Sequence, residues 1–128
     1  MKQLHALAPY FLVKDLLASV EYYHTALGFT RPKLWGEPPG FAMPQRDGLT
    51  VMLKQAEPGM TILPNGFQEH CWDAYVWVQG LDELFAEMKA NGAIIEYGVC
   101  IQEDYGMKEF AVRDPDGYVL AFGEQHEA

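Results

Sequence analysis

Glu109-Phe-Ala-Val-Arg-Asp-Pro-Asp-Gly-Tyr-Val-Leu-Ala-Phe-Gly123 is the stretch that decides the fold of this chain. In its middle, Asp114-Pro-Asp-Gly117 combines a proline that sets φ for a turn with a glycine that adopts backbone conformations other residues resist. Apolar runs on both sides complete the pattern of a β-hairpin. We expect Arg113 to pair with Tyr118. Strand alternation then gathers four side chains on one face of the sheet: Phe110, Val112, Val119 and Ala121.

The length and composition of the chain indicate one domain with a hydrophobic core. The chain has 128 residues, of which 49% are hydrophobic and 13% aromatic, and this excludes a disordered protein. No apolar run approaches the roughly 18 residues of a membrane helix, so we expect no membrane partner. The formal net charge of −9 argues against nucleic acid, which requires clustered Lys and Arg. The net negative charge either favours solubility or attracts a cationic ligand into an acidic cleft.

The N-terminus and the cysteines point to the cytoplasm. Residues 1–5 lack the apolar core of a secretory signal, and two cysteines, Cys71 and Cys100, do not make a disulfide framework. We expect both thiols to be free in a reducing compartment.

The order of predicted elements occurs twice in the chain. A strand at residues 8–13 precedes a helix at about 16–26, and a strand at 72–78 precedes a helix at 80–91. The correspondence extends to single positions, because Val13 and Val78 end the strands, Leu16 and Leu81 begin the helices, and Gly28 and Gly92 end them. We infer an internal duplication of strand, helix and three further strands.

This duplication predicts an α+β domain over residues 1–128. Module one covers about 6–57, a linker about 58–70, and module two about 71–124. Two βαβββ modules of this kind form a curled mixed sheet around a cleft, with the helices on the outer face. Within module one, an Asp-Gly turn centre predicts three cross-strand pairs: Phe41 with Lys54, Met43 with Met52, and Gln45 with Thr50.

Alternation along residues 72–78 separates a helix-facing side from a cleft-facing side. Ala74, Val76 and Val78 face the helix, whereas Asp73, Tyr75 and Trp77 face the cleft. Two large rings and one orienting carboxylate suit a flat or cationic organic ligand. The ligand-binding residues predicted in this way are Tyr10, Trp35, Phe41, Met43, Met52, Asp73, Tyr75, Trp77, Tyr105 and Phe110, with Trp72 at the rim and Ala121 in the lining. For each of them, a role in the core or at a dimer interface stays open.

Three features together resemble the glyoxalase/bleomycin resistance protein/dioxygenase superfamily, also called the vicinal oxygen chelate fold. They are the two βαβββ halves, the opening in which Asp15 begins a helix that ends in Leu27-Gly28-Phe29, and the motif Arg113-Asp-Pro-Asp-Gly-Tyr118. The resemblance spans about residues 8–123. Members include metal-dependent isomerases, lyases and dioxygenases as well as metal-free antibiotic-binding proteins, so the fold does not give the chemistry.

The resemblance implies four metal-ligand positions, which fall on Ala8, Met52, Asp73 and Ala121. Only Asp73 can ligate, whereas a catalytic metal site needs about three protein ligands. We therefore expect no shared metal, no cofactor and no catalytic residue. His5 and His70 each lie three residues before one of these positions, and a strand bulge would let them join a non-standard metal site.

The leading interpretation is a metal-independent small-molecule-binding protein that resembles bleomycin resistance proteins. It would sequester a cationic or planar aromatic ligand, bleomycin-like compounds included, without turnover. The resemblance implies a homodimer with clefts between the chains. The alternatives are a metal-dependent glyoxalase-like lyase or isomerase, an extradiol-type dioxygenase, and a regulatory protein whose aromatic face contacts protein. Whether the modules pair within or between chains stays open.

Overall fold

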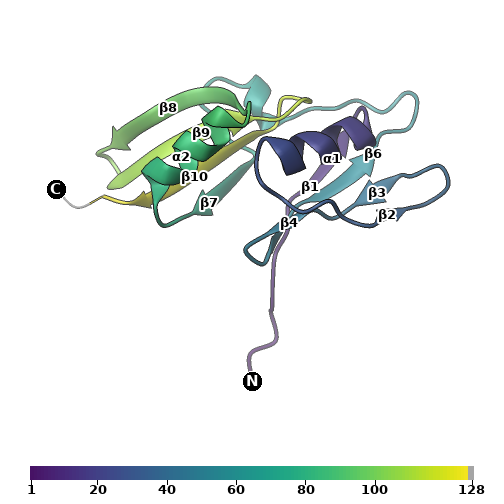
Figure 1. The fold of residues 1–128 in the computed structure, drawn as a ribbon, viewed down its shortest axis with the longest axis horizontal. Coiled ribbons are helices and arrows are strands. Elements are labelled where there is room, and N and C mark those ends of the chain that lie inside the picture. Colours follow the sequence, from purple (N-terminus) through teal and green to yellow (C-terminus); the bar gives the residue numbers. More distant parts are fainter. Residues whose placement is uncertain (127–128) are drawn as a thin grey trace.

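The computed structural model describes residues 1–126 and confirms the α+β class, with one helix in each of two βαβββ modules (Figure 1). Module one contains β1 (Tyr10–Val13), α1 (Leu16–Thr25), β2 (Leu34–Trp35), β3 (Phe41–Ala42), β4 (Gln45–Arg46), β5 (Leu49–Thr50) and β6 (Met52–Gln55). A 3-10 turn, η1 (Asn65–Phe67), lies in the linker. Module two contains β7 (Ala74–Trp77), α2 (Leu81–Ala90), β8 (Ile94–Gln102), β9 (Met107–Arg113) and β10 (Val119–Gln125).

Each module has its own four-stranded mixed sheet. The strand orders are β1-β6-β3-β2 and β7-β10-β9-β8, and β4 pairs with β5 as a separate hairpin. The first and last strands of each module are parallel neighbours, whereas the other pairs in these sheets are antiparallel. Both helices lie on the same side of the sheets (Figure 1). One face of each sheet is therefore covered by a helix, and the opposite face is left without one.

The two helices begin and end where the sequence predicts. The Asp15 carboxylate accepts a hydrogen bond from the Ala18 N–H at 3.2 Å, as expected of a helix N-cap. Gly28 and Gly92 follow the helices with φ of 78° and 92°, a left-handed conformation that favours glycine. No helix among residues 1–126 is long and apolar enough to cross a membrane. Both cysteines are free, as predicted.

The predicted hairpin of β9 and β10 is confirmed, but its predicted register is wrong by one residue. Val119, rather than Tyr118, lies opposite Arg113. The cause is an additional pair at the turn, because the Asp114 N–H donates to the Tyr118 carbonyl at 2.8 Å and leaves a three-residue loop. A one-residue shift moves each side chain of one strand to the other face. Phe110, Val112, Leu120 and Phe122 consequently share the core beneath α2, while Ala111, Val119 and Ala121 occupy the uncovered face.

The turn between β9 and β10 also joins the two modules. The Lys14 N–H of module one donates to the Asp116 carboxylate at 2.9 Å, and the Tyr118 hydroxyl donates to the Leu12 carbonyl at 2.7 Å. The Phe11 and Tyr118 rings stack with centroids 4.2 Å apart. These contacts show that the modules pack against each other within one chain.

Asp114 anchors this junction from inside. It is 1% exposed and accepts hydrogen bonds from the Tyr23 hydroxyl at 2.9 Å and from the Tyr118 N–H at 3.0 Å. Burial raises the pKa of Asp114 to about 6, against the lowering effect of these hydrogen bonds. Asp114, the first aspartate of the turn motif, is therefore a buried structural residue.

Candidate functional site

The uncovered face of module two carries a buried carboxylate that three phenols surround. Glu109 on β9 is 0% exposed. Tyr75 from β7 donates to it at 3.1 Å, Tyr105 from the β8–β9 turn donates at 2.9 Å, and Tyr97 from β8 donates through a short hydrogen bond. The Trp72 Nε1–H donates in turn to the Tyr97 hydroxyl at 3.0 Å. Aromatic residues from three parts of the module thus converge on one acid.

Small residues on the two central strands make room for these rings. Glu109 lies directly opposite Gly123, and a Cβ at Gly123 would collide with the Tyr75 hydroxyl. The next pair on this face is Ala111 with Ala121. Because none of these three neighbours has a side chain larger than a methyl group, the aromatic side chains can lie across the sheet and reach Glu109.

The phenols remain protonated donors at neutral pH. Burial, followed by the neighbouring Glu109 carboxylate, raises the pKa of Tyr75 to about 12. The same two causes raise the pKa values of Tyr97 and Tyr105 well above the ordinary value of tyrosine. Since all three hydroxyls donate, Glu109 acts only as an acceptor, which is the hydrogen-bonding role of an ionised carboxylate.

The rings around Glu109 form a continuous aromatic surface that is open to solvent. Trp72 and Tyr75 have centroids 4.7 Å apart, Trp72 and Tyr105 6.4 Å, and Tyr75 and Trp77 5.2 Å. Trp77 is 75% exposed and Tyr105 is 48% exposed. We call the set Trp72, Tyr75, Trp77, Tyr97, Tyr105 and Glu109 the module-two face.

Module one has a smaller aromatic surface on its uncovered side. The predicted pairs of Phe41 with Lys54 and of Gln45 with Thr50 are confirmed. Tyr10 lies beside Met52 in the parallel pair and 6.2 Å from the Phe41 ring, and Trp35 pairs with Phe41. We call the set Tyr10, Trp35, Phe41, Met52 and Lys54 the module-one face.

The structure therefore divides the predicted ligand-binding residues into groups. Four of them lie on the module-one face, Tyr10, Trp35, Phe41 and Met52, and three on the module-two face, Tyr75, Trp77 and Tyr105. Met43 lies in the short connection between β3 and β4. Phe110 lies on the other side of its sheet, in the core, because of the register shift.

Asp73 has a different environment from the one predicted for an orienting charge. Its carboxylate accepts three backbone N–H groups, from Asn65 at 2.6 Å, Gly66 at 3.1 Å and Val119 at 2.8 Å. These bonds fasten the linker to β10. The acid that lies among the aromatic side chains is Glu109, which was not predicted because the predicted register placed it on the helix side of the sheet.

The residues at the implied metal positions do not fit a metal ion. Ala8, Met52 and Ala121 offer no carboxylate, imidazole or thiolate, and both Asp73 oxygens already accept backbone hydrogen bonds. Among residues 1–126, no three His, Cys, Asp or Glu side chains gather where they could hold a metal ion. His5 and His70 do not belong to any such group of potential ligands in the described part of the chain.

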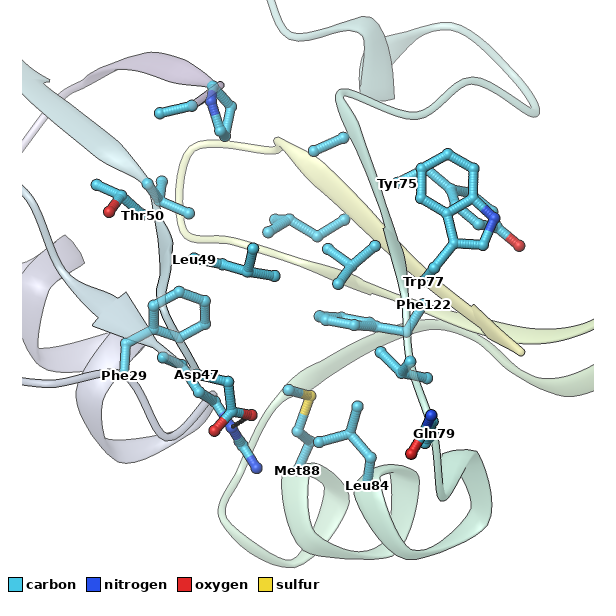
Figure 2. A pocket seen from close by; sticks show the side chains of 18 of the residues that line it. Phe29, Asp47, Leu49, Thr50, Tyr75, Trp77, Gln79, Leu84, Met88 and Phe122 are labelled. Carbon is cyan, nitrogen blue, oxygen red and sulfur yellow. Dashed lines mark ion pairs between the residues drawn. The ribbon is translucent and has the colours of Figure 1, made fainter. Parts of the chain in front are cut away.

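A cavity of about 1100 Å³ lies between the two modules. Its apolar lining includes Phe29, Leu49 and Val51 from module one and Leu84, Met88 and Phe122 from module two. In Figure 2, Tyr75 and Trp77 extend from β7 to the side opposite Phe122 and Met88. Tyr75 and Trp77 are themselves among the residues that line the cavity, although their rings extend to the far side of β7. Arg46 bridges the modules at its margin, donating to Glu87 at 2.8 Å and to the Leu27 carbonyl at 2.7 Å.

Solved structures with the same architecture extend over almost the whole chain. TioX from Micromonospora sp. ML1 is 22% identical with a TM-score of 0.69, and the match covers 94% of this chain and 98% of TioX. The bleomycin-binding protein of bleomycin-producing Streptomyces verticillus, solved with copper(II)-bleomycin, is 20% identical with a TM-score of 0.70 and 100% coverage of both chains. A glyoxalase-related enzyme from Clostridium phytofermentans is 17% identical with a TM-score of 0.75 and 97% coverage of both chains. At these identities the likeness shows the fold.

Sequence comparison with curated proteins finds no match. A family model, by contrast, matches residues 3–122, and its description is Glyoxalase/Bleomycin resistance protein/Dioxygenase superfamily. The match includes both helices and both aromatic faces. The chain therefore belongs to the glyoxalase/bleomycin resistance protein/dioxygenase superfamily.

Proposed function

We propose that this protein binds a cationic or planar aromatic small molecule on its aromatic faces and sequesters it without metal and without turnover. The observation that carries the proposal is the module-two face, which no helix covers. There Tyr75 and Tyr105 donate to the buried Glu109, and the exposed Trp77 ring lies beside Tyr75. Flat rings offer stacking surface to a planar ligand and negative ring faces to a cation. A role in antibiotic resistance in the cytoplasm, with a bleomycin-like ligand, is part of the proposal. It is supported by the fold shared with a protein solved with copper(II)-bleomycin.

The side chains at the implied metal positions favour sequestration over the metal-dependent reactions of the superfamily. A lyase, isomerase or dioxygenase of that kind would need about three metal ligands at the shared positions. Ala8, Met52 and Ala121 cannot supply them.

Binding to the aromatic face can be tested with copper(II)-bleomycin as the probe. We expect saturable binding in isothermal titration calorimetry, and we expect Trp77→Ala to weaken it about fivefold because a stacked aromatic pair contributes about 1 kcal/mol. Leu49→Ala is the matched control, since Leu49 is 53% exposed and lines the inter-module cavity. The probe should be recovered chemically unchanged.

Three results would contradict this proposal. The absence of detectable binding would refute the proposal that the protein sequesters this class of ligand. Weakening by Leu49→Ala and not by Trp77→Ala would place the ligand in the inter-module cavity. Chemical conversion of the probe would show turnover.

The proposal includes a homodimer. It is supported by apolar surface that one chain leaves open: Leu4 and Leu7 in the N-terminal segment are 87% and 96% exposed, and the inter-module cavity is lined with apolar side chains. In Figure 1 this segment extends away from the body of the chain. Open apolar surface of this kind is typical of protein contacts.

We expect light scattering on the eluting protein to give the mass of a dimer. The double variant Leu4→Asp/Leu7→Asp should shift the protein toward monomer, because it places two carboxylates in the proposed contact. Leu63→Asp, at an exposed linker position, should leave the dimer unchanged. A monomeric wild-type protein would refute the homodimer.

A further inference from the structure

The Glu109 carboxylate is buried without a cationic partner. Among the described residues, the ion pairs involve other acids, and the neighbouring Lys108 pairs with Asp82 at 2.7 Å. Buried carboxylates are almost always paired, because removing an isolated charge from water costs several kcal/mol. The phenols of Tyr75, Tyr97 and Tyr105 satisfy the hydrogen bonds of Glu109 but do not neutralise its charge.

What separates this charge from solvent is a layer of aromatic rings. The hydroxyls of Tyr75 and Tyr105 end on Glu109, and Trp72 lies against both of these rings. A phenol that donates to a carboxylate is polarised, and its ring face becomes more negative. A cation over these rings would be attracted both by the ring faces and by the carboxylate beneath them.

We infer that Glu109 makes the module-two face selective for the positively charged group of an organic ligand, which binds over the rings of Trp72 and Tyr105. The ligand class is an organic cation whose charge lies on or beside a planar ring, such as a quaternary heterocycle, an arylammonium or a guanidinium. This inference rests on the proposed function and sharpens it. The proposed function admits neutral planar ligands, whereas the environment of Glu109 disfavours them relative to a cation of the same shape.

A purely structural role for Glu109 gives a different expectation. If its only purpose were to hold the three tyrosines in place, neutral and cationic ligands of one shape would bind equally well. Asp73, the acid predicted for this role, does not replace Glu109, because its carboxylate is engaged by three backbone N–H groups.

The test uses two probes of matched shape, the cation 1-methylquinolinium and the neutral 1-methylnaphthalene. Calorimetric titration of the wild-type protein should give an affinity for the cation that is at least about tenfold higher. In Glu109→Gln the two affinities should differ by less than about threefold, with the affinity for the neutral probe unchanged. Glu57→Gln makes the same change in net charge at an exposed position just after β6, and it should keep the wild-type ratio.

Each result decides the inference. Equal affinities in the wild-type protein would overturn it and leave the proposed function standing. A preference for the cation that survives Glu109→Gln would overturn the assignment to Glu109. If Glu109→Gln unfolds, the wild-type ratio still tests the preference for the cation, and Tyr105→Phe provides a second variant on the same face. It keeps the charge and removes one donor, and it should preserve the preference. Failure of both probes and of copper(II)-bleomycin to bind would remove the proposed function and this inference together.

Discussion

Replacing Phe110 with alanine is expected to lower the free energy of unfolding by about 4 kcal/mol, because large aromatic side chains in a core cost about 3–5 kcal/mol when truncated. Phe110 is 0% exposed. Its ring stacks on Phe122 with centroids 5.1 Å apart and meets the Phe85 ring of α2 edge-on at 5.1 Å. Chemical denaturation followed by circular dichroism measures the change.

The control for this variant is Trp77→Ala on the uncovered face of the same module. Trp77 is 75% exposed, so its removal should change the free energy of unfolding by less than about 1 kcal/mol. The two variants therefore separate packing from ligand contact. A small loss of stability in Phe110→Ala, combined with a loss of ligand affinity, would contradict this prediction. It would show that Phe110 faces the ligand and that β9 and β10 pair in a register other than the one described above.

The helices and the duplication could be predicted because their signals are local. Asp15 caps α1 through its own first turn, and Gly28 and Gly92 supply the left-handed residues that end the helices. The alternation of β7 was also sufficient to separate Val76 from Tyr75, which lie on opposite faces. Short-range geometry decides each of these features, so the sequence contains the information.

The features that could not be predicted depend on groups far apart in the chain. The hairpin register follows from one hydrogen bond between the Asp114 N–H and the Tyr118 carbonyl, and a motif does not show whether its loop closes over three or four residues. The same uncertainty explains why Glu109 was not predicted as a site residue, since a register error of one residue assigns a side chain to the wrong face of the sheet. The partners of Glu109 come from β7, β8 and the β8–β9 turn, which only the folded sheet brings together.

Asp73 shows the same limit, and its role can be decided by experiment. Asp73→Ala is expected to lower the free energy of unfolding by about 3 kcal/mol, because three backbone N–H groups lose a charged acceptor and each such bond contributes about 1.5–3 kcal/mol before non-additivity. Asp73→Asn should cost less, since its amide oxygen can still accept some of these bonds. Asp104→Asn, at an exposed position, should leave stability unchanged. The measurement is again chemical denaturation.

Ligand affinity measured on the folded fraction distinguishes the two roles of Asp73. If Asp73 only fastens the linker to β10, folded Asp73→Asn should bind copper(II)-bleomycin as the wild-type protein does, while its stability falls. An orienting role would give the reverse result, with affinity lost and stability retained. The bond from the Asn65 N–H, at 2.6 Å, and the one from the Val119 N–H, at 2.8 Å, favour the first result, because a carboxylate held by backbone donors on both sides has little freedom to turn toward a ligand.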